Sequence, residues 1–188
     1  MSAPFLLVTG FGSFEDVSAN PSGALARLLD RRPDVVGVEL PVSFTRAPGA
    51  LDRVLAGLPA PPAGILSLGV HPDSGFRLER YARPDLDAER VDVDGGVGAA
   101  LGWAGPVLET SLDLDGLAAR LGAAGAECSI SDDAGRYVCE CVYRHGLTRA
   151  TELGIPGLFL HVPPMASLAV EDQLPAVELV VEAVLGGA

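Results

Sequence analysis

Two cysteines lie close together in the stretch SDDAGRYVCECVYRHG, which spans residues 131–146. A cysteine can be a buried structural thiol, a metal ligand, half of a disulfide or a nucleophile. The stretch follows a small-residue turn, and its pattern predicts a helix that begins near Asp133 or Ala134 and runs to about residue 150. Cys139 would lie about one turn into it, where unpaired N–H groups and the helix dipole favour the thiolate. This placement indicates a nucleophile.

The other roles of a cysteine leave weaker traces in this sequence. Cys141 is two positions beyond Cys139 and points to a different helix face, so the pair is a poor chelate. No second cluster of Cys or His completes a zinc site, and we expect no metal. The chain has three cysteines, which cannot all pair, and this low count predicts a reducing, disulfide-free compartment. A single helical cysteine is more often a small buried hydrophobic residue.

His161 and Glu79 change that balance because they supply the two partners that a thiol nucleophile uses. His161 closes the apolar run LFLHVPP and could act as a base toward a thiol. Glu79 is a carboxylate inside an apolar run, where an unpaired charge would be costly. Read singly, His161 is a satisfied core histidine, and Glu79 is a partner of Arg80 or of another arginine. Nucleophile, base and orienting acid together are the parts of a catalytic triad, and both interpretations stay open at this point.

Short apolar runs alternate with amphipathic stretches along the whole chain. We predict strands over 5–11, 35–42, 64–70, 76–82, 126–131 and 155–163. We predict helices from Asn20, as N-cap before Pro21, and over 46–57, 114–123, 134–150 and 169–185. Residues 83–110 have no clear period and predict a long loop. Such alternation favours right-handed crossovers and a mainly parallel sheet that is covered on both faces.

The carboxyl ends of the strands carry the polar residues of interest. Residues 9–14 follow the first strand, residues 132–139 follow the strand at 126–131, and His161 ends another strand. In open α/β sheets, ligands bind at this edge. We therefore expect one site that contains Cys139 and His161.

Length and charge exclude several classes of protein. The 188 residues suit a single domain over 1–188, with 48% hydrophobic and 5% aromatic residues, so the core must be aliphatic. The net charge is −12 and no Lys/Arg-rich run occurs, which argues against nucleic acid as a partner. The apolar run near the N-terminus is too short for a signal peptide or a membrane span. We expect a cytoplasmic protein without a membrane partner.

Five segments resemble, in the same order, those of the pyroglutamyl peptidase I (pyrrolidone-carboxylate peptidase) family, and they cover nearly the whole chain. LLVTGFGSF (6–14) with NPS (20–22) resembles the opening VTGFGPF…NPS, and ELPVSF (39–44) resembles LPVSY. FRLERYA (76–82) resembles the ERxA segment around the catalytic glutamate. SDDAGRYVCE (131–140) resembles SNxAGxYVCN around the nucleophile, and LFLHVPP (158–164) resembles the FIHVP segment around the histidine.

This resemblance implies a three-layer α/β/α sandwich with a mainly parallel or mixed twisted sheet. It implies a cysteine-type omega-peptidase without metal or cofactor, which removes N-terminal pyroglutamate from peptides through an acyl-enzyme, and an assembly that is often a homotetramer. Carried over by position, Cys139 is the nucleophile, His161 the general base and Glu79 the residue that orients the imidazole. Backbone N–H groups at the start of the helix would stabilise the oxyanion.

The resemblance also assigns a pocket for a small neutral lactam. Phe11 and Phe14 match the two aromatic residues of the family's opening turn, and Val138 matches an apolar wall beside the nucleophile. Asn20 matches the asparagine near the pocket. Each has an ordinary interpretation as well, since the two phenylalanines can be core residues and Asn20 is explained as a helix cap.

Several positions depart from the family pattern. The turn GVHPDSG (69–75) replaces a GQAGGR-like turn, so Val70 stands where a glutamine is expected. Pro84 and Glu140 each stand where an asparagine is usual. The expected arginine falls on Glu89, and a one-residue gap would give its role to Arg90. We count Val70 and Arg90 among the expected substrate-binding residues.

These departures concern the pocket more than the catalytic set, and they keep two other hypotheses open. The first is a diverged family member with an altered substrate or a non-catalytic binding role. The second is a nucleoside-phosphorylase-like enzyme on a similar sandwich, which would need a phosphate site that the sequence does not display. His71 could replace a lost pocket contact or be a solvated loop residue.

Overall fold

The computed structural model describes residues 3–13 and 20–186 of the chain. Within these residues, six strands form one sheet in the order β2-β1-β3-β8-β4-β7. The strands are β1 (Leu6–Phe11), β2 (Val35–Leu40), β3 (Gly64–Val70), β4 (Phe76–Glu79), β7 (Cys128–Ser131) and β8 (Gly157–Val162). All neighbouring pairs are parallel except β4 with β8, which is antiparallel.

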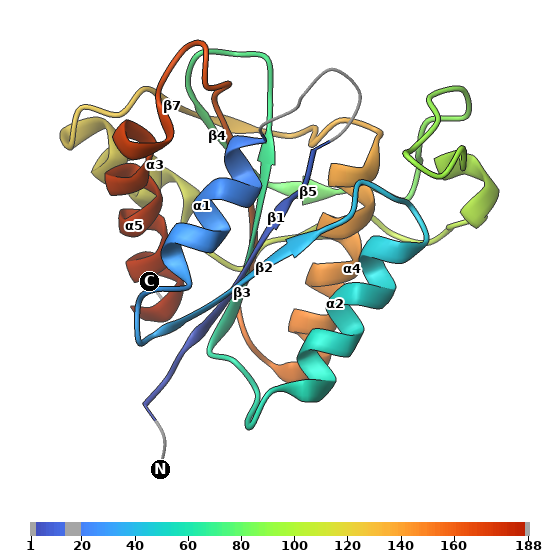
Figure 1. Cartoon of the computed structure of the whole chain (residues 1–188), viewed down its shortest axis with the longest axis horizontal. Helices are drawn as coiled ribbons and strands as arrows, with labels where there is room; N and C mark the ends of the chain where they lie inside the picture. The colour runs from blue at the N-terminus through green and yellow to red at the C-terminus, as the bar shows by residue number, and fades with distance from the viewer. Residues whose placement is uncertain (1–2, 14–19, 187–188) are drawn as a thin grey trace.

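Helices cover both faces of this sheet (Figure 1). They are α1 (Pro21–Leu29), α2 (Arg46–Gly57), α3 (Leu114–Ala123), α4 (Val138–Leu153) and α5 (Val170–Gly186). Helices α1, α3 and α5 pack on one face, and α2 and α4 pack on the other. The predicted three-layer α/β/α sandwich with a mainly parallel or mixed sheet is therefore confirmed.

The direction of β4 follows from the length of the connection before it. Only residues 71–75 separate β3 from β4. A parallel neighbour needs a crossover of a dozen or more residues, so this short turn can only return the chain antiparallel. Because β8 then enters between β3 and β4, β4 runs opposite to β8.

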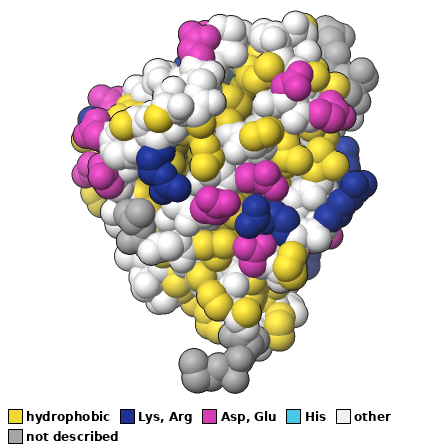
Figure 2. All heavy atoms as spheres, turned by 90° about the vertical axis from the view of Figure 1, so that its left-hand side faces the viewer, with side chains coloured by type: hydrophobic (Ala, Val, Ile, Leu, Met, Phe, Trp, Pro, Cys, Tyr) yellow, Lys and Arg dark blue, Asp and Glu magenta, His cyan; other side chains and the backbone are white. Residues whose placement is uncertain are grey.

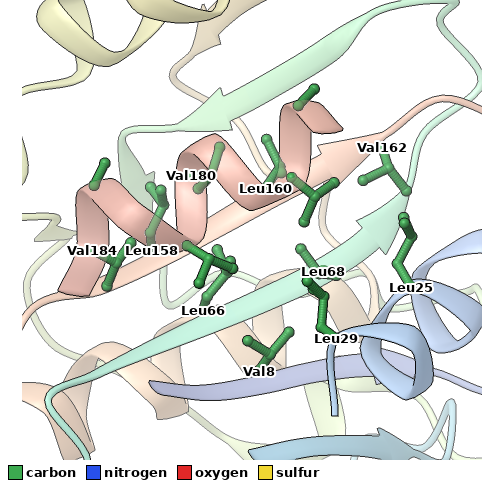
Figure 3. Close-up of a cluster of buried hydrophobic side chains, with 14 of the residues drawn as sticks. Val8, Leu25, Leu29, Leu66, Leu68, Leu158, Leu160, Val162, Val180 and Val184 are labelled. Carbon is green, nitrogen blue, oxygen red and sulfur yellow. The ribbon is translucent and has the colours of Figure 1, made fainter. Parts of the chain in front are cut away.

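Alternation along the strands separates an aliphatic core from the side chains that could do chemistry. Figure 3 shows the core between the sheet and helices α1 and α5, formed by Val8, Leu25, Leu29, Leu66, Leu68, Leu158, Leu160, Val162, Val180 and Val184. Successive strand residues point to opposite faces. Phe159 and His161, which alternate with Leu158, Leu160 and Val162, therefore point toward the face that α4 covers.

The strand expected over 76–82 is divided in two. β4 ends at Glu79, and Tyr81–Ala82 form β5, which pairs antiparallel with β6 (Leu108–Glu109) in a separate sheet. The register of β4 with β7 and with β8 ends at Glu79. N of Arg80 still donates to the carbonyl of Ser131 at the end of β7, and from Tyr81 onward the chain pairs with β6. The expected loop over 83–110 accordingly contains β6 and a short 3-10 helix, Gly98–Leu101.

The expected start of the helix near Asp133 or Ala134 is also wrong. Helix α4 begins at Val138, with Tyr137 as its N-cap residue. Gly135 has φ +76°, a left-handed conformation that interrupts a right-handed helix. Cys139 is therefore the second residue of α4, and its N–H group lies among those that the helix itself leaves unpaired.

Figure 2 looks onto the side of the molecule that carries α3 and α5. Acidic and basic side chains are scattered there among apolar ones, and neither sign of charge dominates this face. Among the helices in the described residues, none combines the length and the apolar character that a membrane span requires.

The contact between α1 and β2 yields a stability prediction. A Cβ atom on Gly37 would lie 2.0 Å from the carbonyl oxygen of Ala26 and 2.9 Å from Cβ of Asp30. We expect Gly37→Ala to lower the free energy of unfolding by roughly 1–3 kcal/mol or more, because the helix must move away from the strand. The measurement is the urea midpoint at unchanged m-value.

Gly122→Ala is the matched control for this substitution. A Cβ atom there has no neighbour within 4 Å, and Gly122 lies inside α3. We expect a gain of about 0.5–1 kcal/mol from helix propensity. Equal losses of stability in the two variants would contradict the proposed crowding at Gly37.

Candidate active site

Glu79 and His161 are joined by a buried hydrogen bond. Nδ1 of His161 lies 2.7 Å from Oε1 of Glu79, and the two residues are 2% and 0% exposed. Because a carboxylate can only accept, the Nδ1–H group donates and Nε2 is left as the basic nitrogen. The antiparallel register makes this contact, since Arg77 lies opposite His161 and Glu79 lies opposite Phe159. The sequence prediction that these two residues share a site is consistent with this geometry.

Cys139 and His161 line the same cavity, which has a volume of about 520 Å³. Gly69 of β3 pairs with His161 in the sheet. A Cβ atom at Gly69 would lie 3.0 Å from Sγ of Cys139 and 2.7 Å from the ring of Phe159. Only a glycine leaves room here for the thiol beside the histidine strand.

The Cys139 thiol is partly exposed to the cavity and enclosed by protein on its other sides. Burial raises its pKa to about 12, and the negative charge of Glu79 acts in the same direction, whereas Arg90 opposes them. The expectation that the helix N-terminus makes this group a thiolate at rest is therefore wrong. With this pKa the thiol is protonated at neutral pH, and it would have to give its proton to a base before its sulfur could attack a substrate.

The structure places most of the predicted substrate-binding residues around this cavity. Phe11, Asn20, Val70, Arg90 and Val138 all line it. Phe14 lies outside the residues that the structure describes. The placement of Arg90 agrees with the one-residue gap proposed from the sequence.

Asn20 uses its side chain within the protein. Its Oδ1 accepts hydrogen bonds from N and Oγ of Ser22 at 3.1 and 2.8 Å, and its Nδ2 donates to the carbonyl of Gly12 at 3.1 Å. The predicted helix cap is confirmed. The side chain also fixes the turn that follows β1 at the edge of the cavity.

Sequence reasoning did not single out Tyr137, which forms part of the cavity wall. The guanidinium of Arg90 lies 3.9 Å from the centroid of the Tyr137 ring, and the Tyr137 hydroxyl donates to the carbonyl of Val91 at 2.8 Å. These contacts tie the 83–110 connection to the start of α4. The signal was available, because an aromatic residue two positions before the nucleophile is part of the matched motif.

Two of the departures from the family pattern meet in space. Glu140 is fully buried, and its Oε1 accepts a 2.6 Å hydrogen bond from N of Arg83, the residue before Pro84. Its Oε2 has no protein partner. Burial raises the pKa of Glu140 to about 8, and the negative charges of Asp133 and Glu79 add to that effect. A neutral carboxylic acid therefore follows Cys139 at pH 7.

The remaining histidines differ in their relation to the site. His71 lines the cavity, and its ring centroid lies 5.4 Å from that of His161. His145 instead pairs with Asp52 of α2 at 2.8 Å, in the contact between α4 and α2. Over residues 3–13 and 20–186, no three His, Cys, Asp or Glu side chains gather as a possible metal site.

Comparison with known protein families gives one match over nearly the full length. The family model described as pyroglutamyl peptidase matches residues 5–187. Pyrrolidone-carboxylate peptidase 1 of Ralstonia nicotianae is 33% identical over 180 residues, which cover 88% of this chain and 81% of that protein. The pyrrolidone-carboxylate peptidase of Halalkalibacterium halodurans is 30% identical over 185 residues, with coverage of 93% and 91%.

Solved structures of proteins with the same description share the fold. A variant of the pyrrolidone carboxyl peptidase of Pyrococcus furiosus superposes with a TM-score of 0.88 at 26% identity, over 97% of this chain and 98% of that one. The enzyme of Thermococcus litoralis gives a TM-score of 0.86 at 28% identity, with coverage of 98% and 94%.

The buried acid at Glu140 predicts a pH-dependent stability. The folded chain keeps its proton up to about pH 8, whereas the unfolded chain loses it near 4.5. The folded state therefore binds the Glu140 proton more tightly than the unfolded state does. As a result, the free energy of unfolding falls as pH rises from 4.5 to 8, and this group causes no further change above pH 8. Glutamine does not titrate. We therefore expect the free energy of unfolding of Glu140→Gln, relative to that of the wild type, to rise by up to about 4 kcal/mol between pH 5 and pH 8.

Urea unfolding of both proteins across this pH range measures the difference. Glu171→Gln, at an exposed position in the first turn of α5, is the control and should show a nearly constant difference. A constant difference for Glu140→Gln as well would mean that Glu140 is ionised throughout.

Proposed function

The chain belongs to the pyroglutamyl peptidase family, whose members are cysteine peptidases that remove N-terminal pyroglutamate from peptides, and we propose that Cys139, His161 and Glu79 carry out this reaction here. The observation that carries the proposal is the 2.7 Å bond between Glu79 and His161 at the wall of a cavity that also holds Cys139. Nε2 of His161 remains as the base for the thiol proton. Glu79 fixes the ring and stabilises the imidazolium that forms.

The proposed reaction proceeds through a thioester. Sγ of Cys139 attacks the pyroglutamyl carbonyl carbon while Nε2 of His161 takes the thiol proton. The tetrahedral intermediate collapses, the C–N bond breaks, and the imidazolium gives its proton to the leaving amine. A water molecule, activated by the neutral imidazole, then hydrolyses the thioester and releases pyroglutamate. Each proton taken by His161 is returned, so the enzyme ends in its starting state.

The start of α4 supports stabilisation of the oxyanion. Cys139 is the second helical residue, so its backbone N–H has no partner within the helix. The positive end of the helix dipole points toward the same place. Donors that are fixed before the reaction act most strongly where charge develops, and losing one such donor typically costs about 100-fold or more in rate.

The cavity supports a small, uncharged substrate group. Phe11, Val42 and Val138 give it apolar walls, and a lactam ring carries no charge to be desolvated. We propose that Phe11, Asn20, Val70, Val138 and Arg90 form the subsite for the pyroglutamyl ring, with Phe14. Arg90 would act at the rim, where it stacks on Tyr137.

We also propose the setting in which this enzyme works. We propose that residues 1–188 form a single domain and that the protein works in the cytoplasm. A reducing compartment agrees with the free cysteines Cys128, Cys139 and Cys141. Assembly into a homo-oligomer, as the tetramers of the family suggest, is supported by exposed Val91, Val93 and Val107 on the 83–110 connection. Light scattering of the purified chain measures the number of subunits.

The non-catalytic alternative rests on Val70, Pro84 and Glu140, because these three positions depart from the family pattern around the expected site. Titration of Cys139→Ala with a pyroglutamyl amide by calorimetry measures binding without turnover. Tight binding by this variant, together with a wild type that lacks turnover, would favour a binding protein. Measurable turnover by the wild type would exclude that alternative.

The nucleophile is tested by substitution. We expect Cys139→Ala to reduce the release of a fluorescent amine from a pyroglutamyl amide by at least about 10³-fold, because no other group can form the thioester. Cys128→Ala is the control, since Cys128 lies on the edge strand β7 away from the cavity. Iodoacetamide should inactivate the wild type and Cys128→Ala alike. Unchanged turnover by Cys139→Ala would sink the proposal.

A further inference from the structure

Arg77 is a charged residue beside the Glu79–His161 pair. It lies two residues before Glu79 on β4, so both side chains point to the face that α4 covers. Its Nε lies 3.5 Å from Oε1 of Glu79, and its side chain is only 18% exposed. Among the described residues, it is the one arginine whose guanidinium lies within 4.0 Å of the Glu79 carboxylate.

The same guanidinium connects three further segments. One nitrogen donates to Nε2 of His71 at 2.6 Å and lies 3.5 Å from a carboxylate oxygen of Asp73, both in the turn between β3 and β4. The other donates to Oγ of Ser131 at 2.5 Å and to the carbonyl of Asp133 at 3.0 Å. Arg77 thus joins the catalytic acid, one wall of the cavity and the loop that leads to Cys139.

The Glu79 carboxylate needs such a partner. It is fully buried, one oxygen bonds to His161, and the other oxygen has no hydrogen-bond partner. Burial without a positive charge favours the protonated acid, which would no longer stabilise an imidazolium. A guanidinium stays charged at every pH at which the enzyme can work.

The other charged and titratable groups around the pair do not replace Arg77. His71 and Asp73 face the Glu79–His161 pair from the β3–β4 turn, and Asp133 faces it from the loop before α4. Helix α4 contributes Cys139, Glu140 and Tyr143, and the 83–110 connection contributes Arg90. Burial lowers the pKa of His71, and the positive charge of Arg77 lowers it further, so this imidazole is neutral. Arg90 stacks on Tyr137 and acts on the thiol.

We propose that Arg77 is a positioning residue of this peptidase, which holds Glu79 as a carboxylate against His161 and holds His71 in the cavity wall. The proposal rests on the proposed function only for the identity of the reaction. The contact between Arg77 and Glu79 belongs to the fold, whether or not the chain turns over a substrate.

The first test is the pH profile of kcat/KM for Arg77→Gln, Arg77→Lys and the wild type. Loss of a positive charge next to the pair makes proton uptake easier, so the acidic limb should move to higher pH by about one to two units in Arg77→Gln. Arg77→Lys keeps the charge and should keep the limb within about half a unit. A lysine cannot bind His71 and Ser131 at the same time, so the KM of Arg77→Lys should rise several-fold.

Arg32→Gln is the matched control. Arg32 is also partly buried and paired with two carboxylates, Asp34 and Glu178, but lies outside the cavity. We expect Arg32→Gln to be somewhat less stable than the wild type, and we expect the acidic limb of its kcat/KM profile to lie at the same pH as that of the wild type. A normal limb in Arg77→Gln, even with a lower kcat, would overturn the proposal and leave Arg77 a structural residue.

A second measurement separates this inference from the proposed function. The chain has three histidines, so His161 can be assigned and titrated by NMR in the Cys139→Ala background, where no turnover is needed. The midpoint of the first protonation of the Glu79–His161 pair should rise by the same one to two units with Arg77→Gln. An unchanged midpoint would overturn the proposal, even in a chain without peptidase activity.

Arg77→Met, which keeps the length of the stem and lacks the charge, serves as the neutral variant if Arg77→Gln does not fold. In the same NMR titration, its midpoint should rise by the same one to two units, Arg77→Lys should retain the wild-type midpoint, and Glu79→Gln should lower it because the anion itself is lost. An unchanged midpoint in Arg77→Met would mean that the charge at position 77 does not control the pair.

Discussion

The buried carboxylate of Glu79 is the constraint on which the rest of the site depends. It can remain charged only where donors and a positive charge surround it, and it must also reach Nδ1 of His161. The antiparallel course of β4 satisfies both conditions, because it places Arg77 and Glu79 beside His161 on one face of the sheet. That course follows from a turn too short for a crossover helix. The length of a loop and the chemistry of the site are therefore linked.

Local signals were sufficient for the sandwich but not for the details around the site. The Asn20 cap and the bounds of α2 and α3 were predicted correctly because neighbouring residues determine them. The start of α4 depends on the left-handed Gly135, whose conformation the sequence does not reveal. The division after Glu79 depends on where two other strands end. The role of Arg77 depends on the register with β8, a long-range contact that no local pattern contains.

The departures from the family pattern form a connected change. Glu140 is paired with the backbone beside Pro84, so a carboxylic acid is accommodated where an asparagine is usual. A protonated carboxyl group resembles an amide group in size, although the glutamate side chain is one methylene longer than that of asparagine, and it keeps the site free of a second negative charge. The matched motifs pointed to Cys139, His161 and Glu79, whereas the consequence of Glu140 could only be read from its burial and its contact with Arg83.

In the proposed reaction, the charges of the site explain why Cys139 can rest as a thiol. Glu79 already supplies one buried negative charge near Sγ, and a resting thiolate would add a second. Transfer of the proton to His161 creates a thiolate and an imidazolium together, so the net charge of the cavity does not change. The imidazolium then lies against Glu79, and the sulfur lies at the positive end of α4. Each new charge thus finds a partner that the fold has already fixed, which is the condition for electrostatic stabilisation of the transition state.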